Sequence, residues 1–393
     1  MSGGLQVQKG RPLSGADILA NARALADDIR AEDLAAQYDE LRRLPDDLFA
    51  RVRDTGVLRM NMPRSWGGPE MTSMEQVEVI ESLSAADASV GWCSFIWTDS
   101  GLYSGYLDDQ VGREMYPHLD MATSGWIYPV GTALRLDGGY RVSGNWMFGS
   151  GSAHCDWLAA GCLVDDVDSE RPIDHWRIVL APPDDFEILD TWYTTGLRGT
   201  GSNDYRATDL FVPEERVFTF FDAKRDGALW RRPDALLRKM AGVPLGVAAD
   251  ALASARTLLE TKTDRLVGMP YRNMGRVQAE IATAHGKLGA ARAYVFHALE
   301  RQWAKLESGE PLTVEERVDT WLSRSQAFQT GREVVAQLYD LVGGAAIYSG
   351  KGPFDRHLRD MQTACQHLVA QTRGVENAGQ VLLGVDDAAH PMI

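Results

Sequence analysis

The sequence predicts an α+β fold in which helices at both ends flank a β domain. The apolar residues follow a helical period up to about residue 121, a period of two up to about 225, and a helical period again to the end. At 393 residues the chain also exceeds the size of about 250–300 residues at which one core usually stops growing. We therefore expect an N-terminal α-helical domain at 1–121, a central barrel-like β domain at 122–225 and a C-terminal four-helix bundle at 226–393.

The N-terminal region contains several helix signals. Ser14 can cap one helix, and Gly56 can end a second that begins near Pro45. Ser73 and Gln76 have the spacing of a capping box for a third. The next helical stretch is rich in aromatic residues, which either form core, the commoner outcome, or line a pocket for a flat ligand. These are Trp92, Phe95, Trp97, Tyr103 and Tyr106.

The central region is predicted to be a set of short strands. Residues 133–144 have the pattern of a β-hairpin around the turn Asp137-Gly138-Gly139. Further strands are predicted at 157–164, 176–181, 186–192 and 205–212. Between the last two lies the glycine-rich stretch 196–204, GLRGTGSND, whose backbone can approach a ligand closely and surround it with donors. On its own, such a stretch is more often a surface turn.

The C-terminal region returns to a helical pattern. Apolar residues at 277, 281, 284, 288, 291, 295 and 298 alternate steps of four and three, as in a packed bundle helix. Thr313 and Glu316 form a capping box for another helix, which should end at Gly343-Gly344. A last helix is predicted from about 356 to 383.

Composition excludes several classes of function. The net charge of -15 argues against a nucleic-acid-binding surface. Four scattered cysteines without a C-x-x-C pair indicate reduced thiols and neither a zinc site nor a disulfide framework. No apolar run approaches the ~18 residues of a membrane span, and the N-terminus lacks the features of a signal peptide. We expect a cytoplasmic protein without a metal.

The common catalytic and nucleotide motifs are missing. Gly199-x-Gly201-x-x-Asp204 lacks the third glycine of the dinucleotide fingerprint and leads into a strand, where that motif requires a helix. The chain has no Walker A sequence, no G-x-S-x-G elbow and no H-E-x-x-H. Hydrolase and metalloenzyme functions are therefore disfavoured.

Several motifs in a fixed order carry a family resemblance. They are residues 137–151 (DGGYRVSGNWMFGSG), the stretch 196–204, Val212-Pro213, Gly343-Gly344 and Arg359-Asp360. Together with the α–β–α order they resemble the acyl-CoA dehydrogenase superfamily over nearly the whole chain. Within it, residues 150–157 (SGSAHCDW) and the GTGSND phrase resemble the flavin-dependent monooxygenase branch, the oxygenase components of two-component hydroxylases.

One departure from the dehydrogenases concerns their catalytic glutamate, which follows the Arg-Asp pair by some nine residues. Here no glutamate occurs in that region before Glu376, and His367 lies there instead. Removal of a proton from the α-carbon of a thioester needs a carboxylate base, so acyl-CoA dehydrogenation is disfavoured. An imidazole can deprotonate or hydrogen-bond an aromatic hydroxyl or an indole nitrogen, and it can protonate a flavin–oxygen adduct. The alternative is a histidine satisfied within the bundle.

The resemblance implies a reduced flavin, FAD or FMN with FADH2 preferred, delivered by a separate NAD(P)H:flavin reductase. O2 would give a C4a-hydroperoxide that hydroxylates an aromatic or indolic small molecule. Phenol-hydroxylating relatives tend to carry a histidine where this chain has residues 92–100, so an indole or polycyclic aromatic is expected rather than a simple phenol. The resemblance and the bundle seam also suggest a homotetramer.

The resemblance also assigns residues. The catalytic candidates are His367 and Ser150, whose hydroxyl is expected near the flavin N5 or the peroxide. The cofactor-binding candidates are Trp146, Phe148, Ser150, Gly151, Thr200 and Ser202, with Arg272, Arg276 and Arg359 for the flavin phosphate, from this subunit or a neighbouring one. Each arginine taken singly is more often a solvated helix residue. The substrate-binding candidates are Trp92, Trp97, Asp99, Ser100, Tyr103 and Asn203. His154 is interpreted as structural more than catalytic.

Two other functions remain open at this stage. One is a flavin-dependent dehydrogenase of the same fold with a displaced base, Glu376 or Asp360. The other is a non-catalytic helical assembly protein that kept the fold and lost the cofactor.

Overall fold

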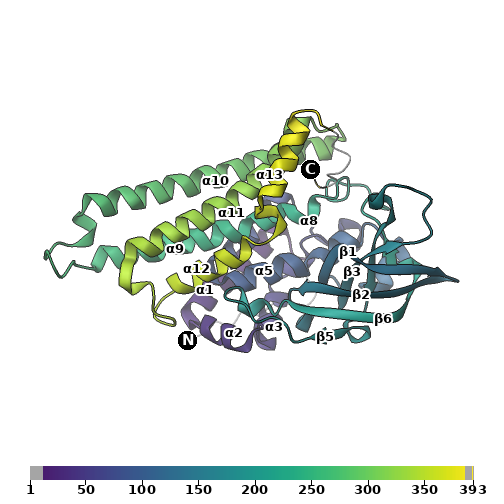
Figure 1. Ribbon diagram of the computed structural model, residues 1–393, viewed down its shortest axis with the longest axis horizontal. Coiled ribbons are helices and arrows are strands. Elements are labelled where there is room, and N and C mark those ends of the chain that lie inside the picture. The colour runs from purple at the N-terminus through teal and green to yellow at the C-terminus, as the bar shows by residue number, and fades with distance from the viewer. Residues whose placement is uncertain (1–11, 386–391, 393) are drawn as a thin grey trace.

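The structure is a computed structural model that describes residues 12–385 and residue 392. The sheet formed by the middle region of the sequence lies at one end of the molecule, and long antiparallel helices extend away from it (Figure 1). Helices from both halves of the sequence pack together, since α4 (Ser73–Ala86) lies against α9 (Gly242–Thr261). The α+β class and the α–β–α order are confirmed. The domain boundaries at 121 and 225 stay a prediction.

The N-terminal helices begin at side-chain caps in several places. Ser14 caps α1 in a capping box with Asp17. The predicted box at Ser73 and Gln76 is wrong by one residue, because Thr72 caps α4 and pairs with Glu75. The helices are α1 (Gly15–Glu32), α2 (Ala35–Leu41), α3 (Asp46–Asp54), α4 (Ser73–Ala86), α5 (Ala88–Trp97), α6 (Asp99–Tyr103) and α7 (Asp109–Met115).

The central region forms one mixed sheet with the order β5-β6-β2-β1-β3-β4-β7. The predicted hairpin is confirmed, with Arg135 opposite Tyr140, and β1 pairs β3 in parallel. The strand predicted at 186–192 ends early, because the N–H groups of Thr191 and Trp192 turn to the side chain of Asn203. The strands are β1 (Thr123–Leu136), β2 (Gly139–Gly149), β3 (Trp157–Val164), β4 (Trp176–Ala181), β5 (Glu187–Leu189), β6 (Asn203–Pro213) and β7 (Val217–Phe218).

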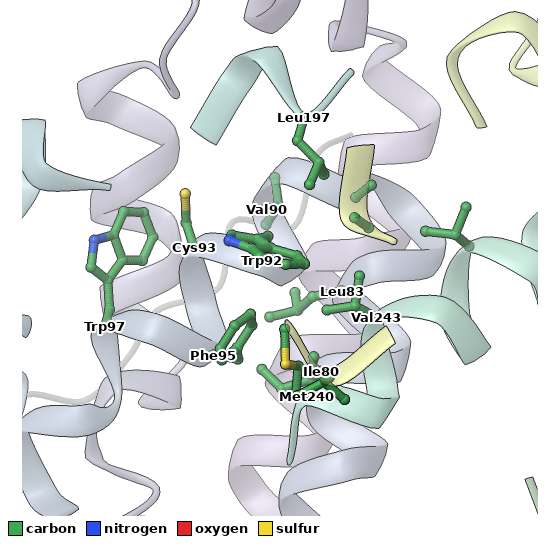
Figure 2. Close-up of a cluster of buried hydrophobic side chains, with 14 of the residues drawn as sticks. Ile80, Leu83, Val90, Trp92, Cys93, Phe95, Trp97, Leu197, Met240 and Val243 are labelled. Atoms are coloured by element: carbon green, nitrogen blue, oxygen red, sulfur yellow. The ribbon is translucent and has the colours of Figure 1, made fainter. Parts of the chain in front are cut away.

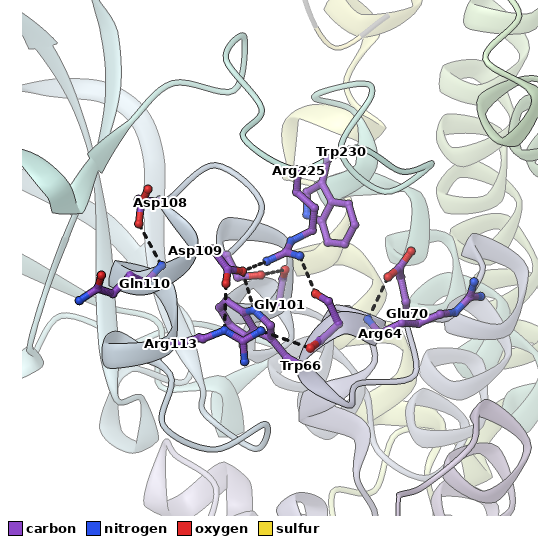
Figure 3. A network of polar contacts seen from close by, with 12 residues as sticks. Arg64, Trp66, Glu70, Gly101, Asp108, Asp109, Gln110, Arg113, Arg225 and Trp230 are labelled. Carbon is purple, nitrogen blue, oxygen red and sulfur yellow. Dashed lines mark hydrogen bonds and ion pairs between the residues drawn. The ribbon is translucent and has the colours of Figure 1, made fainter.

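A polar network fastens the segment after the sheet to the N-terminal helices (Figure 3). The carboxylate of Asp109 accepts hydrogen bonds from Trp66 Nε1 at 2.8 Å, Arg225 Nη2 at 2.7 Å and Arg113 Nε at 2.9 Å. These donors hold the pKa of Asp109 well below its usual range. The ring of Trp66 also lies beneath both guanidinium groups. The network joins parts of the chain more than a hundred residues apart.

The C-terminal helices α9, α10 and α11 run side by side (Figure 1). The capping box of Thr313 and Glu316 at the start of α11 is confirmed. The prediction of one continuous helix at 356–383 is wrong, because the helix is interrupted at His367. The backbone of His367 is extended, and its ring accepts the N–H of Val369. The helices are α8 (Ala235–Arg238), α9 (Gly242–Thr261), α10 (Gly275–Ser308), α11 (Val314–Val342), α12 (Phe354–Ala364) and α13 (Thr372–Leu382).

The described residues include neither a membrane-spanning helix nor a metal-binding cluster. None of the described helices is long and apolar enough to cross a membrane. Across residues 12–385 and 392, no group of three or more acidic, histidine or cysteine side chains could hold a metal ion. The four cysteines are buried free thiols.

Candidate active site

Three buried hydroxyl groups form a chain at the rim of the sheet, and we call Ser150, Ser202 and Thr200 the hydroxyl chain. Ser150 directly follows β2, while the other two lie in the glycine-rich stretch that precedes and enters β6. Ser150 Oγ lies 2.7 Å from Ser202 Oγ, which lies 2.6 Å from Thr200 Oγ1. Two motifs that are fifty residues apart in the sequence thus meet through their side chains.

The ends of the hydroxyl chain fix its direction. Thr200 Oγ1 donates to the carbonyl of Leu197 at 2.7 Å, and Trp92 Nε1 donates to Ser150 Oγ at 3.1 Å. Because each hydroxyl carries one proton, Ser150 donates to Ser202 and Ser202 donates to Thr200. A fully satisfied buried network of this kind is rigid, and it holds the Ser150 oxygen in one place.

His367 lies close to the same indole. Its ring centroid is 5.8 Å from that of Trp92 in an edge-on arrangement. Although the residue keeps some exposed surface, desolvation of the imidazole lowers the pKa of His367 to about 4. The ring is therefore neutral at pH 7. Trp92 thus contacts Ser150 with its nitrogen and His367 with its ring.

The hydrogen bond of the His367 ring indicates its tautomer. Nδ1 accepts the N–H of Val369 at 3.3 Å, which leaves the proton on Nε2. Within the described part of the chain, no hydrogen bond engages that Nε2–H group. The arrangement therefore presents a neutral hydrogen-bond donor.

The surroundings of Trp92 are apolar. Figure 2 shows its indole among Leu83, Val90, Phe95 and Leu197. Its ring also packs edge-to-face with Phe95 at 5.2 Å. This packing holds the indole in place, so its N–H stays directed at Ser150.

Aromatic rings form an open platform beside the hydroxyl chain. Phe148 is half exposed and has a positive φ of 61°, a conformation that costs a non-glycine residue about 1–3 kcal/mol. Its ring meets Trp126 at 5.6 Å and Trp192 at 6.4 Å, edge-to-face in both cases. Because Ser150 N donates to Phe148 O at 2.8 Å, the strained residue and the hydroxyl chain belong to one tight turn.

The indole of Trp97 packs against this turn at Gly151. Trp97 Nε1 donates to Gly151 O at 3.0 Å. Gly151 has a positive φ of 70°, and a Cβ there would lie 2.3 Å from the Trp97 nitrogen. Glycine is therefore required on both grounds. Trp97 itself is fully buried, so it supports the turn and presents no open face.

Three predicted residues serve the structure of the sheet and its surroundings. Trp146 is buried within the sheet, where its Nε1 donates to Gly161 O at 2.8 Å. Asn203 binds the backbone that carries Trp192. Tyr103 packs in a second core cluster against Phe218 at 5.4 Å.

Asp99 and Ser100 form buried polar pairs next to the site. Asp99 Oδ1 accepts from Lys239 Nζ at 2.8 Å, and burial raises the pKa of Asp99 while Lys239 lowers it. Ser100 Oγ lies 2.7 Å from Thr123 Oγ1. Thr123 adjoins Ser124, whose hydroxyl donates to Ser150 O at 2.6 Å. The role of Lys239 is not predicted from the sequence, where the signal for it is a lysine just before the apolar segment that forms α9.

The predicted arginines are not brought to the hydroxyl chain. Arg359 is engaged within the chain by Asp39, Asp355 and the carbonyl of Thr195. Arg272 and Arg276 are exposed at the start of α10, at the end of the molecule opposite the sheet (Figure 1). Arg272 borders a groove of 450 Å³ there.

His154 has structural contacts. Its Nε2 lies 3.1 Å from Asp46 Oδ1, and its ring stacks on Phe49 at 4.8 Å. Desolvation lowers the pKa of His154. These contacts favour the structural interpretation, in which His154 joins the turn after β2 to α3.

Family comparisons agree with this architecture. Residues 16–114 match the model of the acyl-CoA dehydrogenase N-terminal domain, and residues 239–372 match that of the C-terminal domain. The fold therefore places the chain in the acyl-CoA dehydrogenase superfamily.

Relatives that match over most of the chain indicate a branch of this superfamily. The pigment production hydroxylase of Rhodococcus erythropolis is 30% identical over 90% of this chain and 92% of that protein. The indole-3-acetate monooxygenase of Acinetobacter baumannii is 29% identical over 93% and 94%. The flavin-dependent monooxygenase oxygenase subunit HsaA of Mycobacterium tuberculosis is 28% identical over 89% and 91%, and its crystal structure superposes with a TM-score of 0.87 over 97% of this chain and 100% of that one, at 25% identity. The chain belongs to the flavin-dependent monooxygenase branch of the superfamily.

Proposed function

We propose that this chain is the oxygenase component of a two-component monooxygenase, which uses reduced FAD or FMN and O2 to hydroxylate an aromatic or indolic small molecule. A separate NAD(P)H:flavin reductase supplies the flavin. The reduced flavin contributes the two electrons that let one oxygen atom enter the substrate while the other leaves as water. The observation that carries the proposal is the contact of Trp92 with both Ser150 and His367.

The residues at the rim fit a flat ring with polar edges. Phe148 supplies an exposed aromatic face, and Ser150 supplies a hydroxyl in the same turn. We propose that they contact the flavin ring, while Thr200 and Ser202 keep the Ser150 oxygen in place. Trp92 and its apolar neighbours exclude water from this side of the ring.

His367 takes the role of a neutral donor in this proposal. With a pKa of about 4, it is not an imidazolium at pH 7, and its Nδ1 lone pair already accepts from Val369. Its Nε2–H group can hydrogen-bond an oxygen atom at the reacting centre. Such a preorganised N–H dipole would stabilise negative charge that develops on that oxygen atom.

The dehydrogenase alternative lacks a suitable base. Asp360 is buried and already accepts the N–H of Leu197 at 2.7 Å, and Glu376 is exposed on α13. Asp360 reaches the hydroxyl chain only through the backbone of Leu197, and among the described residues neither carboxylate contacts a hydroxyl of that chain. A flavin-binding titration distinguishes the monooxygenase from a non-catalytic assembly protein, because the latter would bind neither reduced nor oxidised flavin.

Substrate and assembly belong to the same proposal. The similarity to the indole-3-acetate monooxygenase of Acinetobacter baumannii favours an indolic substrate. A homotetramer is supported by large apolar side chains exposed along the C-terminal helices, including Val375, Leu382 and Leu383. Light scattering on the purified chain tests the assembly.

We also propose a cytoplasmic location, since the four cysteines are free thiols.

The test is rapid mixing of the protein and anaerobically reduced flavin with oxygenated buffer. We expect a transient species that absorbs differently from both reduced and oxidised flavin. Reoxidation at the rate of free flavin, with no such transient, would overturn the proposal. Addition of indole-3-acetate as a probe substrate then measures oxygenated product per flavin oxidised.

A further inference from the structure

The glycine-rich stretch is fastened to α12 by its backbone, and we call residues 195–202 the rim loop. Leu197 N donates to Asp360 Oδ1 at 2.7 Å, and Arg359 Nη1 donates to Thr195 O at 2.7 Å. Gly196 lies flat on the helix, since a Cβ there would be 2.1 Å from Arg359 O. The loop and the helix therefore fit each other through two hydrogen bonds and a close backbone contact.

Leu197 is the first link between this contact and the hydroxyl chain. It is buried, and its φ of 50° is unusual for a residue with a branched side chain. Its carbonyl accepts both Thr200 Oγ1 at 2.7 Å and Trp192 Nε1 at 2.9 Å. The strained peptide at Leu197 thus orients the end of the hydroxyl chain and one ring of the aromatic platform.

The other side of the contact leads to His367. Asp360 lies on α12, which ends at Ala364, and His367 follows at the break before η11 (Leu368–Ala370). Asp360 is 2% exposed, so its carboxylate has no solvent to replace a lost partner. The helix α12 therefore carries the anchor of the rim loop, and the histidine that faces Trp92 follows three residues after its end.

We propose that Asp360 is a positioning residue that fixes the rim loop on α12 and thereby holds the hydroxyl chain at a set place relative to His367. The inference rests on the function proposed above. It assigns Asp360 no contact with substrate or flavin. Its carboxylate acts through Leu197, whose carbonyl organises Thr200.

The surroundings make this contact sensitive to pH. Burial is the main cause that raises the pKa of Asp360 to about 7, followed by the negative charge of Asp87 at the start of α5. Asp39 of α2 raises this pKa further. The Leu197 N–H group and Arg356 act in the opposite direction and lower it. The ionised carboxylate is the stronger acceptor for the Leu197 N–H group. Other charged or titratable groups near α12 are Asp250 of α9, Arg332 of α11 and, on α12 itself, Asp355, His357 and Arg359. Arg198 of the rim loop donates to the carbonyl of Asp39.

Amide hydrogen exchange of the full chain without flavin tests the anchor directly. In Asp360→Ala the Leu197 amide should exchange at least about tenfold faster at pH 8, whereas Asp360→Asn, which keeps an acceptor oxygen, should stay within about threefold of the parent. Asp250→Ala is the matched control, because Asp250 joins α9 to α12 through His357 at 3.1 Å rather than through the rim loop. Unchanged protection in Asp360→Ala, or equal loss in Asp250→Ala, would overturn the proposal.

Rapid mixing of the reduced-flavin complex with O2 tests the consequence. The transient should decay at least about fivefold faster in Asp360→Ala, with reduced-flavin affinity within about threefold of the parent. The decay rate of the parent should change around pH 7, and that of Asp360→Asn should not. If the parent gives no transient, the proposed function fails; if the parent gives one and Asp360→Ala matches it, only the positioning role fails. Should Asp360→Ala not fold, the pH comparison with Asp360→Asn decides, and a pH dependence shared by both chains would overturn the proposal.

Discussion

The indole nitrogen of Trp92 donates to the hydroxyl of Ser150 at 3.1 Å, and this hydrogen bond joins α5 to the rim of the sheet. The same indole lies edge-on to His367. Three segments far apart in the sequence thus meet at one side chain. The proposed chemistry depends on this meeting point.

Trp92→Phe removes the donor and keeps an aromatic ring. Loss of one buried hydrogen bond should lower the free energy of unfolding by about 1–2 kcal/mol, measured by urea denaturation. The Ser150 oxygen then loses one of the two partners that hold it in place, so the transient in the rapid-mixing experiment should decay faster. An unchanged decay with reduced stability would restrict Trp92 to a structural role.

Ser150→Ala interrupts the hydroxyl chain and leaves the Trp92 N–H group without its acceptor. We expect the transient to decay about tenfold or more faster, because the polar contact beside the flavin is lost. Ser104→Ala is the control, since that buried hydroxyl donates within its own helical turn to Gly101 O. Equal effects of the two substitutions would contradict a special role for Ser150.

His367→Ala should reduce product formation about a hundredfold while reduced flavin still binds. His367→Gln keeps an N–H donor and should recover part of the loss. Because the pKa of His367 is about 4, the ring does not titrate between pH 6 and 9. The pH dependence of the rate in that range should therefore be the same in the parent and in His367→Gln. His285→Ala, an exposed histidine on α10, is the control. A step near pH 6.5 that vanishes in His367→Gln would show that the ring titrates as an ordinary imidazole.

Asp360 predicts a dependence of stability on pH with a definite sign. Its folded pKa of about 7 lies above the ordinary value of 3.8, so between these values the folded chain binds the extra proton. Its contribution to stability is therefore full below about pH 4 and is lost as the pH rises through 7. Asp360→Asn should accordingly reduce the loss of stability between pH 5 and 8 by about 2 kcal/mol, measured by urea denaturation at each pH. Equal pH dependence in both chains would contradict the raised pKa.

The buried pair of Asp99 and Lys239 gives a prediction with its own internal control. Asp99→Asn should destabilise the fold by about 3–5 kcal/mol, because it leaves the Lys239 ammonium buried and unpaired. Lys239→Met in the same chain should restore most of the lost stability. Thermal unfolding of the single and double variants measures the coupling. Absence of rescue would indicate that the pair is not coupled.

The sequence predicts the α–β–α order correctly because each region has a sustained apolar period. It does not predict the break at His367, since the ring that accepts Val369 N–H overrides a pattern that is helical on both sides. Arg359 is predicted to bind the flavin phosphate, and this role stays a prediction. In the structure it pairs with Asp355, four residues earlier on α12, which helical periodicity can locate, and with Asp39 of α2, which periodicity cannot locate.

Ser150, Thr200 and Ser202 were selected from motif resemblance, and the structure brings them together. The roles of Asp360 and Leu197 could not be found in the same way. Their contact depends on a positive φ and on a backbone approach at Gly196, which only the folded chain reveals. Local motifs thus indicate the chemical groups, while the packing of α12 on the rim loop determines their geometry.

The most direct test of the account is the reaction of the protein-bound reduced flavin with O2, followed by absorbance in the parent and in Ser150→Ala. We expect a transient in the parent that decays at least about tenfold faster in Ser150→Ala, with Ser104→Ala matching the parent. Reoxidation of the parent complex at the rate of free flavin would contradict it.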